Sequence, residues 1–167
     1  NLPVNREKSE VAKFKDIVFL GFRIVGRRIR ISEKALEKFR HKVKLLTRRN
    51  NPLSMYQVIT ELSRYLQGWI GYYRIQQMRG ILAELDVWIR RRLRVMQLRK
   101  WKKPKKFQRV MIKAGFDPHE AHSTWVNMKT WHSAGRKIVC FVLSPAWFRH
   151  QGLVFLDDFR PAPPKYS

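Results

Sequence analysis

The sequence has one cysteine, few acidic residues and no long apolar run, and each scarcity excludes a class of protein. Cys140 alone can form neither a disulfide framework nor a zinc ribbon of paired thiolates, which favours a reducing compartment. No apolar run approaches the roughly 18–20 residues of a membrane-spanning helix, and the start of the sequence lacks the apolar core of a signal peptide. We therefore expect neither a membrane partner nor secretion.

Acidic residues are scarce relative to basic ones, with 12 Asp or Glu against 36 Lys or Arg and a formal net charge of +24. The imbalance is greatest from Val87 to Phe116, where twelve basic residues occur without an acidic one. Such a segment repels itself unless a polyanion lies against it. The charge therefore favours nucleic acid first and an anionic membrane surface second, whereas a single short basic run can equally be a solvated face. The 44% hydrophobic content supports a folded core.

The first periodic stretch predicts a β-hairpin. Residues 17–24 are rich in β-branched and aromatic side chains, residues 28–31 alternate with period two, and residues 25–27 suit a turn. Gly21 lies inside the first predicted strand. It indicates a bulge or a close approach of another group to the backbone.

Three amphipathic helices are predicted to follow. Ser32 is a good N-cap for a helix over residues 33–49, and Ser54 with Gln57 forms a capping box for the next. The third helix spans residues 81–101 and ends before Pro104. In this helix the apolar stripe leaves three arginines mostly outside, where their guanidinium groups can meet phosphates: Arg90, Arg91 and Arg94.

A glycine and aromatic cluster ends the second predicted helix. Gly68, Trp69, Gly71, Tyr72 and Tyr73 follow its apolar face. Glycines at this spacing allow close backbone packing and a sharp change of direction. We interpret Gly68, Trp69, Tyr72 and Tyr73 as a structural helix corner. Stacking of the aromatic rings on bases is the alternative.

Beyond Pro104 the pattern predicts a small, mostly helical region. A short helix ends at Gly115, another begins at Asp117, and the apolar run 138–143 is compatible with either a strand or a buried turn of helix. We therefore expect a mainly α fold, with an N-terminal β-hairpin, a three-helix bundle and a small C-terminal helical subdomain.

Metal and catalytic sites have weak signals. A zinc site would require convergence of four ligands, and the candidates are His119, His122, His132 and Cys140. Solvated or capping histidines are the preferred interpretation. Asp157 and Asp158 form an acidic pair with no partner aspartate in a suitable upstream strand. We expect no catalytic residue and no metal in this chain.

Several motifs together resemble the C-terminal part of a group II intron-encoded reverse transcriptase and maturase. Asn5–Ser9 and Phe19–Phe22 are similar to the last two blocks of the polymerase palm. Leu62–Tyr73 resembles the thumb signature, and Leu85–Arg94 with Trp101-Lys102 resembles the basic helix that follows it. The resemblance covers residues 1–115 well. It weakens beyond them, where only Ser144–Ala146 and Gln151–Leu153 look like the family's terminal segment.

The resemblance implies a division into the end of the palm (1–31), the thumb helices (32–104) and a C-terminal nucleic-acid-binding subdomain with a tail (105–167). It implies that Phe19, Leu20, Gly21 and Phe22 form a primer-grip-like turn. The charge pattern and the resemblance together predict that intron RNA is bound by Arg48, Arg49, Arg90, Arg91, Arg94, Arg99, Lys100, Lys102, Lys103, Lys105 and Lys106.

The resemblance also implies the partners and the location. The family binds group II intron RNA to assist splicing, contacts the template–primer, and belongs to mobile elements of bacterial cytoplasm or organelles. Its polymerase chemistry uses Mg²⁺ bound by palm aspartates. Those aspartates are absent from this chain, so Mg²⁺ is expected only in an intact polymerase.

Two alternatives stay open. The chain can be one segment of a complete, active RNA-directed DNA polymerase whose N-terminal portion precedes Asn1. It can also be a general cationic DNA-binding protein, because charge alone does not distinguish RNA from DNA.

Overall fold

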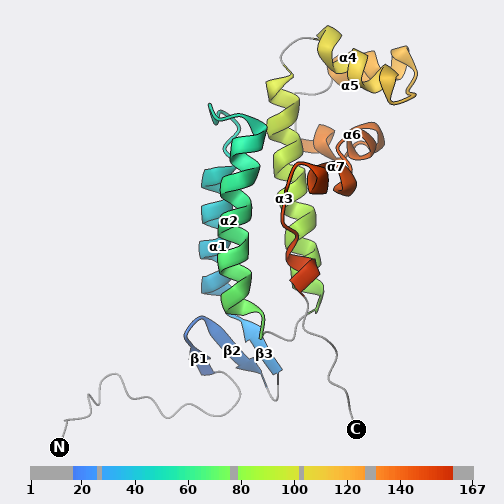
Figure 1. Cartoon of the computed structure of the whole chain (residues 1–167). Coiled ribbons are helices and arrows are strands. Elements are labelled where there is room, and N and C mark those ends of the chain that lie inside the picture. Colours follow the sequence, from blue (N-terminus) through green and yellow to red (C-terminus); the bar gives the residue numbers. More distant parts are fainter. Residues whose placement is uncertain (1–16, 26–27, 76–78, 102–103, 127–130, 160–167) are drawn as a thin grey trace, which may run out of the picture.

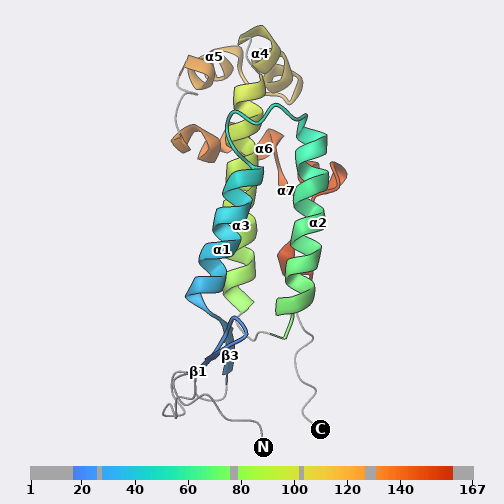
Figure 2. The same cartoon turned by 90° about the vertical axis from the view of Figure 1, so that its left-hand side faces the viewer.

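The computed structural model describes residues 17–25, 28–75, 79–101, 104–126 and 131–159. The fold is mainly α, as predicted, with a small antiparallel sheet at one end of a helical bundle (Figure 1). The bundle is formed by α1 (Glu33–Leu46), α2 (Met55–Tyr73) and α3 (Arg79–Lys100). The three helices run alongside one another in both views (Figures 1 and 2).

The sheet has three strands rather than the two predicted. β1 (Ile17–Phe19), β2 (Phe22–Val25) and β3 (Arg28–Ile31) form an antiparallel meander. The predicted strand over residues 17–24 is divided by a tight turn at Leu20 and Gly21, whose φ angles are 49° and 82°. Two consecutive residues with positive φ match the right-handed twist of the strands they join. The prediction of one long strand was wrong because β-propensity does not reveal a turn whose first residue is leucine.

Gly21 does make the close approach that the sequence indicated, although it forms a turn and not a bulge. A Cβ atom placed on Gly21 would lie 2.5 Å from the hydroxyl oxygen of Tyr73. The hairpin turn is therefore pressed against the last turn of α2. Glycine is required here both by its φ of 82° and by the lack of space.

The helix caps follow the sequence. The hydroxyl of Ser32 accepts a hydrogen bond from the backbone N–H of Ala35, and Ser54 and Gln57 form the reciprocal capping box at the start of α2. Helix α1 ends at Leu46, three residues before the predicted end at Arg49. Thr47 terminates it by donating from both its N–H and its hydroxyl to the carbonyl of Val43.

The prediction that α2 breaks at Gly68 was wrong. The helix continues through Gly68 and Gly71 to Tyr73, because burial of Leu66 and Ile70 outweighs the ~1 kcal/mol cost of a helical glycine. The aromatic side chains pack along the last two turns of a continuous helix. Trp69 lies 4.3 Å from Phe39 and 4.8 Å from Tyr73, measured between ring centroids.

The C-terminal part forms a second layer against α3. Helices α4 (Pro104–Lys113) and α5 (Pro118–Val126) pack on each other at one end of the bundle. The remaining elements lie beside α3 (Figure 1): η2 (Trp131–Gly135), α6 (Lys137–Val142), α7 (Pro145–His150) and η3 (Leu156–Phe159). The run 138–143 is thus a buried turn of helix. Pro104 begins α4, where its missing N–H costs nothing.

Buried side chains of both layers belong to one hydrophobic core. It includes Phe39, Leu66 and Leu93 in the bundle, and Phe107 and Phe148 in the second layer. Within the described ranges no helix is both long and apolar enough to cross a bilayer.

Candidate nucleic-acid interface

Arg94 is buried, which contradicts the expected outward display of this side chain. It is 8% exposed, and its Nε donates a hydrogen bond of 3.0 Å to the carbonyl of Leu143, the C-cap of α6. Its guanidinium carbon lies 6.0 Å from the ring centroid of Phe148. Burial lowers the pKa of Arg94. The sequence pattern missed this because the apolar stripe of α3 reports the contact with α1 and α2, whereas α6 and α7 cover another face.

Arg90 and Arg91 are partly buried and turn toward different elements. The guanidinium carbon of Arg90 lies 5.0 Å from the ring centroid of Phe155, and burial lowers its pKa more than the nearby carboxylate of Asp86 raises it. Arg91 approaches η2, where its Nη2 would lie 3.7 Å from a Cβ placed on Gly135. The sequence predicted one outward cationic surface made by three arginines of α3. The structure contradicts this prediction, because the side chains of Arg90, Arg91 and Arg94 turn toward different elements.

Two further cations of α3 bind carbonyl groups at the end of α1 and in the α1–α2 connection. Arg92 donates to the hydroxyl and carbonyl of Thr47 and to the carbonyl of Lys44. Lys100 donates to the carbonyls of Asn51 and Leu53. Positive side chains are favourable at such C-terminal carbonyls. These two residues therefore connect α3 to the α1–α2 connection. A role of Lys100 in RNA binding is a prediction that its hydrogen bonds do not test.

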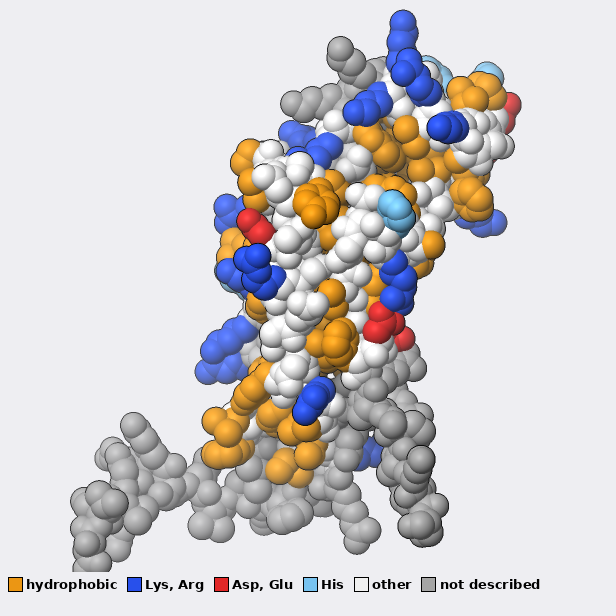
Figure 3. Space-filling model, in the orientation of Figure 1, with side chains coloured by type: hydrophobic (Ala, Val, Ile, Leu, Met, Phe, Trp, Pro, Cys, Tyr) orange, Lys and Arg blue, Asp and Glu red, His pale blue; other side chains and the backbone are white. Residues whose placement is uncertain are grey.

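Lys102 and Lys103, which were also predicted to bind RNA, lie outside the described residues. The remaining predicted RNA-binding side chains are exposed. Exposed side chains are found at Arg48, Arg49, Arg99, Lys105 and Lys106. On α4, Lys105, Arg109 and Lys113 line a shallow hollow together with Gln108 and Ile112. Blue side chains gather at the α4 end of the molecule and along the α1 edge (Figure 3).

Sequence reasoning omitted some exposed cations from the predicted interface. Lys34, Lys38 and Lys42 recur every four residues on α1 and are all exposed. Arg109 and Lys113 continue the basic face of α4 at the same spacing from Lys105. The signal for both sets was their helical periodicity opposite the apolar stripe.

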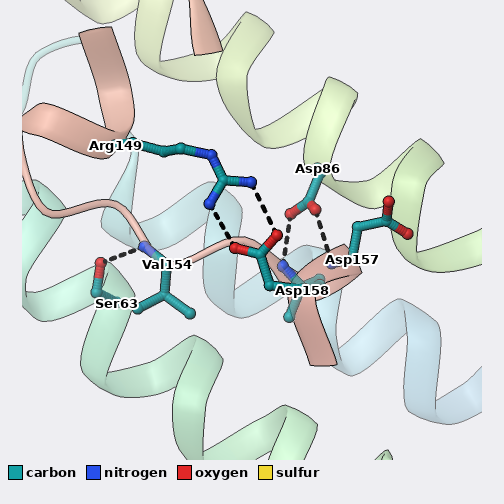
Figure 4. A network of polar contacts seen from close by, with 7 residues as sticks. Ser63, Asp86, Arg149, Val154, Asp157 and Asp158 are labelled. Carbon is teal, nitrogen blue, oxygen red and sulfur yellow. Dashed lines mark hydrogen bonds and ion pairs between the residues drawn. The ribbon is translucent and has the colours of Figure 1, made fainter. Parts of the chain in front are cut away.

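A buried carboxylate on α3 anchors the C-terminal segment (Figure 4). Asp86 is 4% exposed and accepts hydrogen bonds from the backbone N–H groups of Leu156, at 3.0 Å, and Asp157, at 2.9 Å. Burial raises the pKa of Asp86 more than these two N–H groups and Arg90 lower it. On α2, the hydroxyl of Ser63 donates to the carbonyl of Gly152 and accepts from the N–H of Val154.

Asp158, His122 and the backbone of His119 make local hydrogen bonds. Asp158 forms a two-pronged ion pair with Arg149, which lowers the pKa of Asp158. His122 shares a 3.0 Å hydrogen bond with Gln108, and the N–H of His119 donates to Asp117. Among the described residues, no group of three or more His, Cys, Asp or Glu is arranged to hold a metal ion.

The primer-grip-like residues occupy an exposed, well-braced turn. Phe19 and Leu20 are each 66% exposed. The turn packs against the end of α2. The hydroxyl of Tyr72 donates a hydrogen bond of 2.8 Å to the carbonyl of Leu20, and the rings of Tyr72 and Phe22 stack with their centroids 5.5 Å apart. Tyr72 and Tyr73 thus fix the position of the turn, and Trp69 links them to the core through Phe39.

Comparison with known proteins identifies the segment that contains these helices. Residues 36–115 match the model of the group II intron maturase-specific domain. The match extends from α1 to the end of α4 and therefore includes the three-helix bundle and the basic helix α4. No curated protein matches the chain. Residues 36–115 are thus similar to the maturase-specific domain of group II introns, and this similarity supports a maturase function in splicing.

Proposed function

We propose that the chain binds group II intron RNA through the α4 surface, defined as the exposed side chains of Arg99, Lys105, Lys106, Arg109 and Lys113, and that this contact assists splicing. The observation that carries the proposal is the coincidence of this basic, exposed surface with the end of the segment that matches the maturase-specific domain.

The charge environment of the α4 surface supports contact with phosphates. No Asp or Glu occurs from Val87 to Phe116. The nearest carboxylate in the sequence, Asp117, already accepts hydrogen bonds from the N–H groups of His119 and Glu120. Lys and Arg contacts to phosphates position a protein on nucleic acid without reading its sequence. The α4 surface therefore suits recognition of a folded RNA by its shape.

The test is the salt dependence of binding to a group II intron transcript. Changing Lys105, Lys106 and Arg109 together to Gln should reduce the slope of log K against log salt by up to about 0.7–0.9 for each lost phosphate contact. The matched comparison changes Lys34, Lys38 and Lys42 on α1 to Gln, which removes the same charge. A smaller loss of salt slope in the α1 variant than in the α4 variant supports RNA binding by the α4 surface. An equal change, or an unchanged slope in the α4 variant, contradicts it.

The same assay separates RNA binding from general cationic DNA binding. A maturase domain should bind the structured transcript more tightly than duplex DNA of equal length at matched salt, because the RNA presents its phosphates in an irregular three-dimensional arrangement. Equal affinities would favour a general cationic DNA-binding protein and would contradict specific binding of intron RNA.

A second candidate function is contact with a template–primer as part of a larger polymerase, and the exposed apolar turn favours it. Phe19 and Leu20 are exposed, and the hydroxyl of Tyr72 donates a hydrogen bond to the carbonyl of Leu20. Replacing both with Ser should weaken binding to an RNA–DNA hybrid while leaving binding to intron RNA unchanged. Parallel losses for both ligands would contradict this role. Mg²⁺-dependent polymerisation stays a prediction for an intact polymerase only.

A further inference from the structure

A groove on α3 combines an aromatic ring, a carboxylate and two guanidinium groups. Two adjoining hollows of about 490 and 220 Å³ share Glu84 and Trp88 as lining residues. Val87 and Arg91 line the larger hollow, and Ile81 and Arg40 of α1 line the smaller. We call this feature the Trp88 groove.

The lining of the groove combines apolar and charged side chains. Val87 is 55% exposed, which is unusual for an aliphatic side chain on a helix that otherwise buries its apolar face. Trp88 is partly exposed and packs against the core, and the guanidinium carbon of Arg92 lies 5.4 Å from its ring centroid. Glu84 is exposed one helical turn before Trp88. Among the described residues lining the two hollows it is the only acidic one.

We propose that the Trp88 groove holds one unstacked nucleotide of the bound RNA. The base stacks against Trp88 and Val87, and its phosphate contacts Arg40 or Arg91. Glu84 accepts a hydrogen bond from an amino group of the base. This inference rests on the proposed RNA-binding function and adds a contact to a base, whereas the α4 surface contacts only phosphates.

The carboxylate determines which bases fit. Adenine, cytosine and guanine each carry an exocyclic amino group that can donate to a carboxylate. Guanine carries its amino group beside N1–H, so both can donate to the two oxygens of Glu84. Uracil presents only N3–H, between two carbonyl oxygens that would face the same negative charge. The groove should therefore prefer guanine over uracil. Reading an unstacked base by ring stacking and edge hydrogen bonds is the usual mode of recognition for single-stranded RNA.

The charges disfavour an apolar protein segment as the occupant. Such a segment would cover the carboxylate of Glu84 and the guanidinium group of Arg40 without supplying partners, and burying a charge without a partner is costly. A nucleotide offers a stacking ring, an amino donor and an anion together. Charge complementarity thus favours the nucleotide.

The experiment uses the full chain and two nine-residue RNAs, one of uridine only and one with a single central guanosine. Wild type should bind the guanosine RNA more tightly. Glu84→Gln should lower the ratio of the two affinities, because the amide retains only one acceptor oxygen, although loss of a negative charge alone would strengthen binding of both RNAs. Trp88→Leu should weaken binding of the guanosine RNA by about five-fold or more. The matched controls on exposed positions of α2, Glu61→Gln and Tyr56→Leu, should leave the ratio unchanged.

The outcomes separate this inference from the proposed function. If wild type binds the intron transcript but its affinity ratio is one, or if Glu84→Gln leaves the ratio intact, the groove does not hold a base; an occupant of another class, such as a peptide, would give this result. If wild type binds no RNA, the proposed function fails and the inference fails with it. Should Trp88→Leu unfold the chain, the exposed substitutions Glu84→Gln and Val87→Ser still decide the question, since a base contact requires both to lower the ratio.

Discussion

Replacing Arg94 by Ala should destabilise the chain and leave the salt dependence of the proposed RNA binding unchanged. Arg94 belongs to the most basic stretch of the sequence, yet its side chain is buried between α3, α6 and α7. It donates to the carbonyl of Leu143 and lies near the ring of Phe148. A side chain in this position cannot reach a phosphate without leaving the core.

The magnitude follows from the contacts that are lost. A hydrogen bond from a charged donor contributes about 1.5–3 kcal/mol, and its loss leaves the Leu143 carbonyl without that donor. Loss of packing by the arginine stem adds to this, so that the total is roughly 2–4 kcal/mol by analogy with other buried polar deletions. For a chain of this size the melting temperature should fall by roughly 4–16 °C. Arg94→Met, which retains an apolar stem, should lose less.

Thermal melting and salt-dependent RNA binding, measured on the same samples, provide the assay. Arg99→Ala is the comparison variant, because Arg99 lies five residues further along α3 and is exposed. It should keep its melting temperature and lower the salt slope by about 0.7–0.9. The reasoning is refuted if Arg94→Ala melts like wild type and reduces the salt slope, since its guanidinium group would then face the RNA.

Three other substitutions test the packing of the bundle. Trp69→Ala should lower the free energy of unfolding in urea by roughly 2–4 kcal/mol. The loss is smaller than for a fully buried aromatic residue because Trp69 is only partly buried against Phe39. An unchanged unfolding midpoint would mean that the ring is not packed. Gly21→Ala should cost roughly 1–3 kcal/mol because of its positive φ and its contact with Tyr73, and combining it with Tyr73→Phe, which removes the clashing hydroxyl, should recover part of the loss. The pKa of Asp86 is raised in the folded state, so its ionisation lowers the free energy of unfolding as pH rises from about 3.8 through the raised value. Asp86→Asn should lack this decline, and identical pH profiles of the two proteins would contradict the burial of an ionising carboxyl.

Local features of the fold were predictable from the sequence because their causes are local. Ser32 and Ser54 cap helices through residues three positions away, so their signal lies within a few letters of sequence. The buried positions Leu36, Phe39 and Val43 follow from helical periodicity in the same way. The match to the maturase-specific domain covers this same part of the chain.

Features that depend on distant residues were not predictable. Arg94 meets a carbonyl 49 residues later in the sequence, and Asp86 meets backbone N–H groups 70 and 71 residues later. Nothing near either residue indicates these partners. The prediction of an outward Arg94 failed because a helix in the middle of two layers has little solvent-facing surface, and one apolar stripe describes only one of its contacts. The turn at Leu20 is similar, since its brace is the hydroxyl of Tyr72.

Some basic residues of the acid-free segment have partners within the protein, and others are exposed. This difference limits how much the segment can add to the salt slope of RNA binding. Twelve cations lie between Val87 and Phe116, and a count from sequence alone would give a salt slope near 10 if each met a phosphate. Arg90 and Arg94 pack on the second layer, and Arg92 and Lys100 hold carbonyls of the α1–α2 connection. The α4 surface, with five exposed cations, supports a contribution of roughly 4. We therefore expect substitution of all five by Gln to lower the slope by about that amount; a much smaller loss would mean that these five side chains do not meet phosphates.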